Sequence, residues 1–204
     1  VMFKNGKWVL NSKENIQTME FLKKLTDQKL TQPNPAKCDR TACAQALFAA
    51  GKAAFINGSV FLEGWLKDNG GAAINLGSGS FVAAPGKKPV TLGVQDYFTA
   101  YKANGHKAEI AKFMDFIFEP TNYAAFLKAA GGFIPATKSA GVNAAKDPKL
   151  APFIKLLPSA IFYPGDQASW PAVKGAIQQQ VGTALVNPKK TMDALQAKAL
   201  AASK

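Results

Sequence analysis

The sequence has little of what nucleic-acid binding and membrane insertion require. Arg40 is the only arginine, although 25 residues are Lys or Arg, and no run of lysines exceeds two. Because arginine supplies the bidentate contacts to bases and phosphates, the net charge of +12 indicates a solvated basic surface rather than a nucleic-acid partner. No apolar run approaches the roughly 20 residues that cross a bilayer.

Histidine and cysteine are also scarce. His106 is the only histidine, and Cys38 and Cys43 are the only cysteines. A structural zinc site needs four such ligands, so we predict no metal. The close spacing of the two cysteines favours a local disulfide, which would indicate an exported protein, over the alternative of two free buried thiols.

The familiar catalytic motifs are missing as well. The sequence has no G-x-S-x-G elbow, and the Gly-Ser stretch at 77–80 is not followed by the G-K-[ST] of a phosphate-binding loop. His106 lies in a Lys-rich helix start, which is typical of a surface or capping residue. The carboxylates form no paired motif of the kind a glycosidase uses. We therefore predict a protein that is not an enzyme and has no cofactor.

Periodicity and turn residues predict the order of elements. A hairpin with an Asn-Gly turn occupies 1–10, and an amphipathic helix follows the N-cap Ser12. We expect the remaining elements at these places: a helix ended by Gly51, a strand at 52–57 turned by Asn57-Gly58, a helix from Ser59, strands at 71–77 and 94–102, helices at 107–118 and 120–132, and helices after Pro148, including 168–186 and 187–203. This order predicts an α/β fold with mostly parallel strands.

Aromatic side chains gather near predicted loops and turns. They are Phe55, Phe61, Trp65, Tyr97, Phe98, Phe162, Tyr163 and Trp170. Sugars expose apolar C–H faces and many hydroxyls, so a sugar site combines stacked aromatics with Asp, Asn and Gln side chains. Burial in the core is the alternative for each aromatic. For Trp170, which follows a Pro-Gly loop at a helix start, we favour contact with a ligand.

Three stretches resemble one known family. The residues LFAAGKAAFINGSVFLEGW at 47–65, AEIAKFMDFIFEPTNYAAFLKAAGGFIPA at 108–136 and DPKLAPF with the later Trp170 are similar to the solute-binding proteins of carbohydrate ABC importers, the maltose-binding-protein-like family. The resemblance covers nearly the whole chain in the same order. It matches only the C-terminal half of that pattern, so we expect a mature product or a fragment that begins within a fold.

The resemblance implies a two-lobed periplasmic-binding-protein type II-like fold. Residues 1–88 and 136–204 would form a discontinuous C-terminal lobe, and 89–135 would belong to an N-terminal lobe whose remainder lies outside the chain. We therefore expect the apolar face of the helix that carries Phe113 and Ile117 to be orphaned or covered by a partner.

The resemblance also implies a site and a function. Trp170 and the Gly58 corner would face one groove, with Val60 where family members often have a tryptophan and Pro171 where some have an aromatic residue. The candidate ligand-binding residues are Asn57, Ser59, Phe61, Trp65, Asp96, Tyr97, Asp166, Gln167, Trp170 and Lys174. The implied function is capture of a sugar or oligosaccharide between two lobes and its delivery to the membrane permease.

Related functions remain open. The same scaffold could take an acidic oligosaccharide or a phosphorylated polyol, which the basic charge and Lys174 favour. A hydrolase of the cell envelope is a further alternative. In each case we expect a periplasmic or extracellular location, with a lipoprotein tether as one form, and no nucleic-acid partner.

Overall fold

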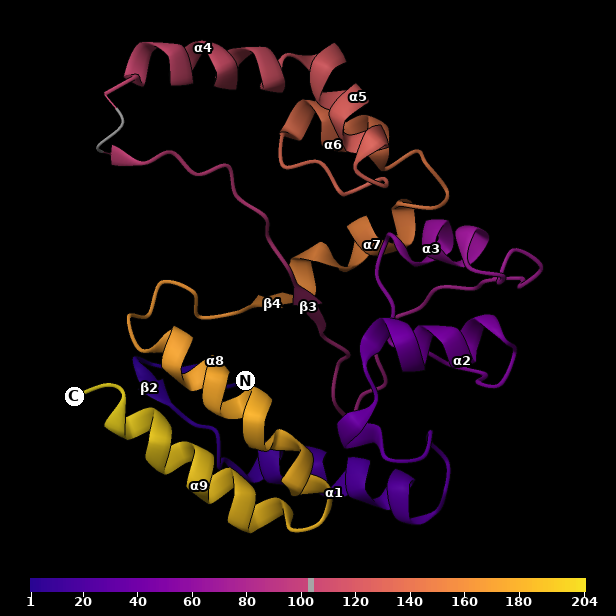
Figure 1. The fold of residues 1–204 in the computed structure, drawn as a ribbon, viewed down its shortest axis with the longest axis vertical. Helices are drawn as coiled ribbons and strands as arrows, with labels where there is room; N and C mark the ends of the chain where they lie inside the picture. The colour runs from indigo at the N-terminus through magenta and orange to yellow at the C-terminus, as the bar shows by residue number, and fades with distance from the viewer. Residues whose placement is uncertain (103–104) are drawn as a thin grey trace. The chain divides into compact units, whose positions relative to one another are not determined.

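The computed structural model describes residues 1–102 and 105–204 and divides them into two compact units (Figure 1). Unit 1 comprises Val1–Ala46 and Tyr163–Lys204, and unit 2 comprises Leu47–Phe162. Helices predominate, and the sheets described have two strands each. This mixed, helix-rich architecture agrees with a generic α/β class. The two-lobed fold and the lobe boundaries at 88 and 136 stay predictions.

Unit 1 begins with the predicted hairpin. Strand β1 (Phe3–Lys4) pairs antiparallel with β2 (Lys7–Trp8). The two residues between them, Asn5 and Gly6, have φ values of 51° and 75°. A two-residue turn with positive φ at both positions matches the twist of paired strands, which is why Asn-Gly is favoured there.

The helix predicted after Ser12 is also present. Helix α1 spans Lys13–Asp27, and its first turn is capped because the Asn15 N–H donates to Ser12 Oγ at 3.3 Å. Ile16 and Met19 pack against the unit 1 core, whereas Leu22 is exposed. The side of α1 that carries Ile16 and Met19 therefore packs on the unit 1 core, as expected for an amphipathic helix.

A short loop-rich segment contains the predicted disulfide. The 3₁₀-helix η1 (Pro35–Lys37) precedes Cys38, which is bonded to Cys43 in the π-helix η2 (Arg40–Gln45). Asp39 caps η2 by accepting the N–H groups of Thr41 and Ala42, both at 2.8 Å. These hydrogen bonds hold the pKa of the Asp39 carboxyl below its usual value.

The C-terminal helices complete unit 1. Helix α8 (Trp170–Gln180) and helix α9 (Pro188–Ala201) lie side by side and are joined through η5 (Val181–Leu185) (Figure 1). The Gln196 amide ties α9 to the hairpin, because Oε1 accepts the Leu10 N–H at 2.7 Å and Nε2 donates to the Trp8 carbonyl at 2.9 Å. The buried cluster consists of Trp8, Leu10, Val173, Met192, Leu195 and Ala199.

Unit 2 has a smaller cluster near its start. Helix α2 (Ala46–Ala49) straddles the boundary between the units and ends, as predicted, before Gly51, whose φ is +68°. Helix α3 spans Leu62–Asp68. Phe48 packs with two leucines of α3, Leu62 and Leu66, and half-buried apolar residues surround the three.

Several predicted elements around α3 are wrong. The segments 52–57, 71–77 and 94–102 contain no strand, and the predicted helix at Ser59 begins only at Leu62. Gly58 has no positive φ and is not in a hairpin turn. A Cβ at Gly58 would lie 2.6 Å from Leu62 Cδ2, so a larger residue here would require the end of the Leu62 side chain to shift. The three segments lack strand partners in the described chain, and a strand forms only where its backbone groups are paired.

A two-stranded parallel sheet joins distant parts of unit 2. Strand β3 (Thr91–Gly93) pairs with β4 (Ala160–Phe162), which the sequence did not predict. Gly93 lies opposite Phe162, and a side chain at Gly93 would collide with the Phe162 ring. The two strands run parallel, and helices connect them.

The helices between these strands are α4 (Lys107–Phe118), α5 (Pro120–Ala129), α6 (Lys138–Ala144), α7 (Ala151–Leu156) and the 3₁₀-helix η4 (Leu157–Ser159). Of these, α6 was not predicted, whereas the others lie where the sequence predicts helix. No residue of α4 is buried, and Phe113 is 52% exposed. The apolar face of α4 is thus incompletely covered within the described chain, as predicted. Phe98 makes ring contacts with Phe113, Phe118 and Phe126.

Candidate functional site

The loop that leads into α8 brings four chemically useful side chains together. Tyr163, Asp166, Gln167 and Trp170 lie within eight residues of one another in unit 1. Successive turns hold the backbone: the N–H of Gly165 donates to the Tyr163 carbonyl at 2.8 Å, and that of Trp170 donates to the Gln167 carbonyl at 2.9 Å. The loop is therefore shaped by its own hydrogen bonds.

Stacked rings form the apolar part of this site. The Tyr163 ring lies on Trp170 with centroids 5.4 Å apart and an interplanar angle of 26°. Trp170 stacks in turn on Trp8, at 6.2 Å and 15°, and the Phe3 ring meets Trp8 edge-on at 4.9 Å. Trp170 is half-buried and packs against the unit 1 core, so its contact with a ligand stays a prediction.

In the polar part of the site Asp166 is exposed and Gln167 is half-buried. The Gln167 Nε2 donates to Asp166 Oδ2 at 2.9 Å, which leaves the second carboxylate oxygen and the amide oxygen as acceptors. Lys174 is exposed on α8, one turn beyond Trp170. This combination of aromatic faces with neighbouring acceptors and one cation suits a hydroxylated ligand with an apolar face.

The other predicted site residues belong to unit 2. Asn57 and Ser59 are exposed in the loop before α3, while Phe61 and Trp65 are half-buried. Trp65 packs against the cluster of Phe48, Leu62 and Leu66, in agreement with the alternative that it is a core residue.

Asp96 and Tyr97 lie on the exposed segment after β3. The Tyr97 hydroxyl donates to Gln95 Oε1 at 2.6 Å. The ligand-binding role of these two residues stays a prediction.

The structure thus groups the predicted residues by unit. Asp166, Gln167, Trp170 and Lys174 come together at the start of α8 in unit 1. Asn57, Ser59, Phe61 and Trp65 surround the start of α3 in unit 2. The shared groove expected between Trp170 and the Gly58 corner stays a prediction, because these residues belong to different units.

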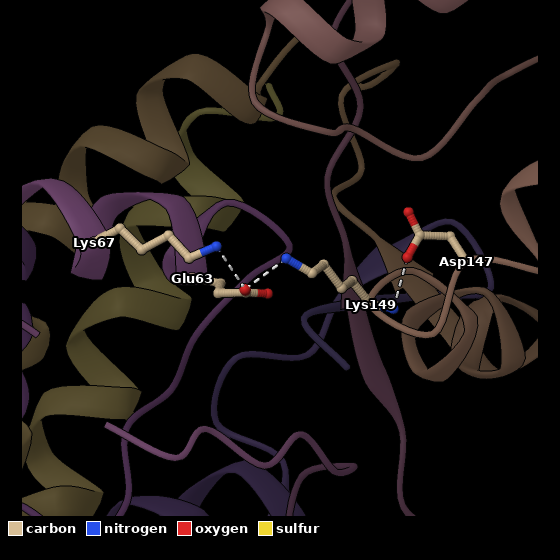
Figure 2. A network of polar contacts seen from close by, with 4 residues as sticks. All are labelled: Glu63, Lys67, Asp147 and Lys149. Carbon is tan, nitrogen blue, oxygen red and sulfur yellow. Dashed lines mark hydrogen bonds and ion pairs between the residues drawn. The ribbon is translucent and has the colours of Figure 1, made fainter. Parts of the chain in front are cut away.

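The clearest electrostatic feature lies near α3 in unit 2. Figure 2 shows Glu63 between two lysines: its Oε1 is 2.7 Å from Lys149 Nζ and 3.1 Å from Lys67 Nζ. The lysines, Lys149 foremost, hold the pKa of Glu63 below its usual value, and Glu63 raises that of Lys149. The Lys149 N–H donates to Asp147 Oδ1, which fixes the loop before α7 (Figure 2).

A groove of about 380 Å³ also lies within unit 2, between α5 and α6. Apolar residues such as Phe118, Leu127 and Phe133 line it together with Lys128 and Asn143. None of the predicted site residues contributes to this groove.

Residues 1–102 and 105–204 contain neither a cluster of metal ligands nor a helix that could span a membrane. No group of three His, Cys, Asp or Glu side chains there is placed to hold a metal ion. None of the helices in that part of the chain combines the length and apolar character that a membrane span needs.

Two residues of the aromatic stack, Trp8 and Tyr163, were not among the predicted site residues. Trp8 was assigned only to the hairpin, and Tyr163 was noted as an aromatic residue near a loop but not as a site residue. A Tyr seven residues before a helix-opening Trp, joined to it by a Pro-Gly turn, was the available signal for Tyr163. Trp8 carries no such signal, because its ring partner Trp170 lies near the other end of the chain.

Comparisons with known proteins identify no family for this chain. No model of a known protein family matches it, and no curated protein matches it either. The resemblance to solute-binding proteins of carbohydrate importers therefore stays a prediction.

Proposed function

We propose that the chain belongs to the substrate-binding component of an ABC importer and contributes to the capture of a sugar or oligosaccharide. The observation that carries this proposal is the stack of Tyr163, Trp170 and Trp8 in the same loop region as two acceptors, the exposed Asp166 and the half-buried Gln167. A stacked ring system offers an apolar face to the C–H side of a sugar, and the acceptors are available to its hydroxyls.

The sequence motifs supply the transport part of the proposal. In the proposed protein a second lobe lies outside these 204 residues, and the ligand is held between the two lobes. Closure of the lobes around the sugar shifts the population toward a form that the membrane permease recognises. Binding involves no chemical change in the ligand. The disulfide between Cys38 and Cys43 is compatible with the extracellular or periplasmic location that this function needs.

Thermal-shift screening of the full-length protein, with both proposed lobes, against a library of mono- and oligosaccharides tests this function. A sugar at a hundred times its dissociation constant should stabilise the folded state by roughly 2.7 kcal/mol. The double variant Asp166→Ala, Gln167→Ala should lose most of that shift, because two hydroxyl partners are removed from an exposed loop.

Asp68→Ala is a matched control, since Asp68 is an exposed carboxylate on α3 outside the predicted site. A library that contains no stabilising sugar, or a double variant with an unchanged shift, would contradict the proposal.

An anionic ligand is the second candidate, and the exposed Lys174 near Trp170 favours it. Acidic sugars bound through Lys174 should lose affinity as salt is raised, whereas neutral sugars should not. The same screen, repeated with uronic acids and phosphorylated polyols at two salt concentrations, separates the two candidates.

A further inference from the structure

The rings of the aromatic stack differ in exposure in a regular way. Trp8 is 4% exposed, Trp170 is half-buried, and Tyr163 is 44% exposed. Stacking contacts run in the same order, from Trp8 to Trp170 and from Trp170 to Tyr163. The stack therefore begins in the unit 1 core and ends in solvent at Tyr163.

From this order we infer that Tyr163 is the ring that stacks on the ligand, and that Trp170 supports Tyr163 from behind. This inference rests on the proposed function and names the contact residue of that site. Trp170 already stacks on two other rings, which occupy much of its aromatic surface. Tyr163 has one ring neighbour in the described chain, and 44% of the residue is exposed, so it is the ring of the stack with the most surface left for a ligand.

The buried end of the stack is fixed by hydrogen bonds. The Trp8 Nε1 donates to Ser169 Oγ at 3.1 Å and to Ser203 Oγ at 3.0 Å. Ser169 immediately precedes Trp170, and Ser203 follows the end of α9. Since the single indole N–H of Trp8 is shared between two serine hydroxyls, this edge of the ring is anchored, and Trp8 gives Trp170 and then Tyr163 a defined position before any ligand arrives. Such preorganisation reduces the entropy that is lost on binding.

The loop backbone brings the polar groups close to Tyr163. The Gly165 N–H donates to the Tyr163 carbonyl, and the Gln167 N–H donates to the Pro164 carbonyl at 3.1 Å. Asp166 and Gln167 follow Tyr163 by three and four residues. Their carboxylate and amide acceptors therefore belong to the same hydrogen-bonded loop as the Tyr163 ring.

This arrangement points to a particular class of ligand. A single exposed tyrosine offers one aromatic face, which suits one pyranose ring at this position. The adjacent oxygen acceptors favour a ring whose hydroxyls lie at its edge, as they do in neutral hexoses and in oligosaccharides that end in one.

Two Tyr163 variants and a control test the contact. Tyr163→Leu keeps apolar bulk but removes the aromatic face, whereas Tyr163→Phe keeps the face and removes only the hydroxyl. Phe21→Ala is the control, because Phe21 is an aromatic residue of similar exposure, 48%, on α1 in the same unit. The probe is the saccharide that gives the largest thermal shift with the unmodified protein, and its dissociation constant is measured by isothermal titration calorimetry.

We expect Tyr163→Leu to weaken binding by roughly tenfold, the upper end of what an aromatic contact contributes. Tyr163→Phe and Phe21→Ala should stay within about threefold of the unmodified protein. Unchanged binding in Tyr163→Leu would overturn the inference and leave the proposed function standing. If no saccharide binds the unmodified protein, both are overturned.

Discussion

Unit 1 and unit 2 differ in how they place their apolar side chains. Unit 1 gathers six buried residues from the hairpin, α8 and α9 into one cluster, whereas the main cluster of unit 2 has three, Phe48, Leu62 and Leu66. Unit 2 also leaves Phe55, Val82 and Tyr101 almost fully in solvent. Because burial of apolar surface is the main favourable term in folding, more of the stability within this chain should come from unit 1.

The difference follows from where regular structure forms. In unit 1 the two ends of the chain meet, so the hairpin residue Trp8 packs with Val173 and Leu195 from the C-terminal helices. In unit 2 the segment between α3 and α4 contains only the short strand β3 in its described part. Apolar residues on such a connection have few neighbours to pack against. Helices that pack on one another therefore create a core more readily than strands without partners.

Removing a side chain from the unit 1 cluster should have the largest effect. Leu195 on α9 is 1% exposed, and Leu195→Ala should destabilise the protein by about 2–5 kcal/mol through lost burial and the cavity left behind. Urea denaturation followed by circular dichroism measures this change. Leu200→Ala, on the same helix at 51% exposure, should stay within about 0.5 kcal/mol. Equal costs at the two positions would contradict the assignment of the core to this face of α9.

The disulfide of unit 1 should have the next largest effect. Cys38 and Cys43 close a loop with a sequence separation of 5. Constraining a loop of this size in the unfolded chain contributes about 2 kcal/mol, so the double variant Cys38→Ser, Cys43→Ser should lose about that much. Chemical denaturation with and without a reductant measures the loss. The reductant should destabilise the unmodified protein and leave the double variant unchanged, and an insensitive unmodified protein would contradict the prediction.

The contrast between the units also explains how far the sequence could predict the fold. Helix positions with local signals were correct: Ser12 caps α1, Pro120 opens α5 and Gly51 follows α2. The predicted strands at 52–57 and 71–77 were wrong because a strand depends on a partner that local sequence does not specify. The short strand β4 was missed for the same reason, since only its pairing with β3 defines it.

The candidate site shows the same limit. Trp170, Asp166 and Gln167 are neighbours along the chain, and their grouping could be predicted from the turn that precedes α8. The support of Trp170 by Trp8 could not, because it depends on the hairpin packing against the C-terminal helices. Gly58 was predicted to turn a hairpin, but in the structure it lies in the loop before α3, beside the Leu62 side chain. A glycine that follows an asparagine therefore does not by itself identify a hairpin turn.

A substitution on the exposed face of α4 should have a smaller effect than those in unit 1. Phe113 is half exposed and meets only Phe98 edge-on among the described aromatic rings. Phe113→Ala should therefore cost less than about 1 kcal/mol, compared with about 3–5 kcal/mol for a fully buried phenylalanine. Urea denaturation over a range of protein concentrations measures this. If Phe113→Ala lost as much stability as Leu195→Ala, another chain would have to cover α4 in solution. The proposed difference in packing between the two units would then be wrong.

The smallest effect should come from the ion pairs at Glu63, and it should depend on pH. The lysines lower the pKa of Glu63 in the folded protein, so the charged carboxylate stabilises unit 2 at neutral pH. That contribution is fully present above the pKa of glutamate in the unfolded chain. It is lost as the pH falls through the lowered pKa of the folded protein. Glu63→Gln should therefore be slightly less stable than the unmodified protein at neutral pH and equally stable in acid.

A double-mutant cycle with Lys149→Met separates this pair from other carboxylates. Glu63 and Lys149 are partly exposed, so salt and side-chain entropy keep their coupling weak. The coupling measured in urea at neutral pH should be favourable, should shrink in high salt and should vanish in acid. The same cycle with Lys67→Met should give a weaker coupling, because the Lys67 contact is longer, at 3.1 Å against 2.7 Å. A coupling that persists after the carboxyl is protonated would mean that Lys149 holds the loop before α7 through packing or through Asp147, rather than through the charge on Glu63.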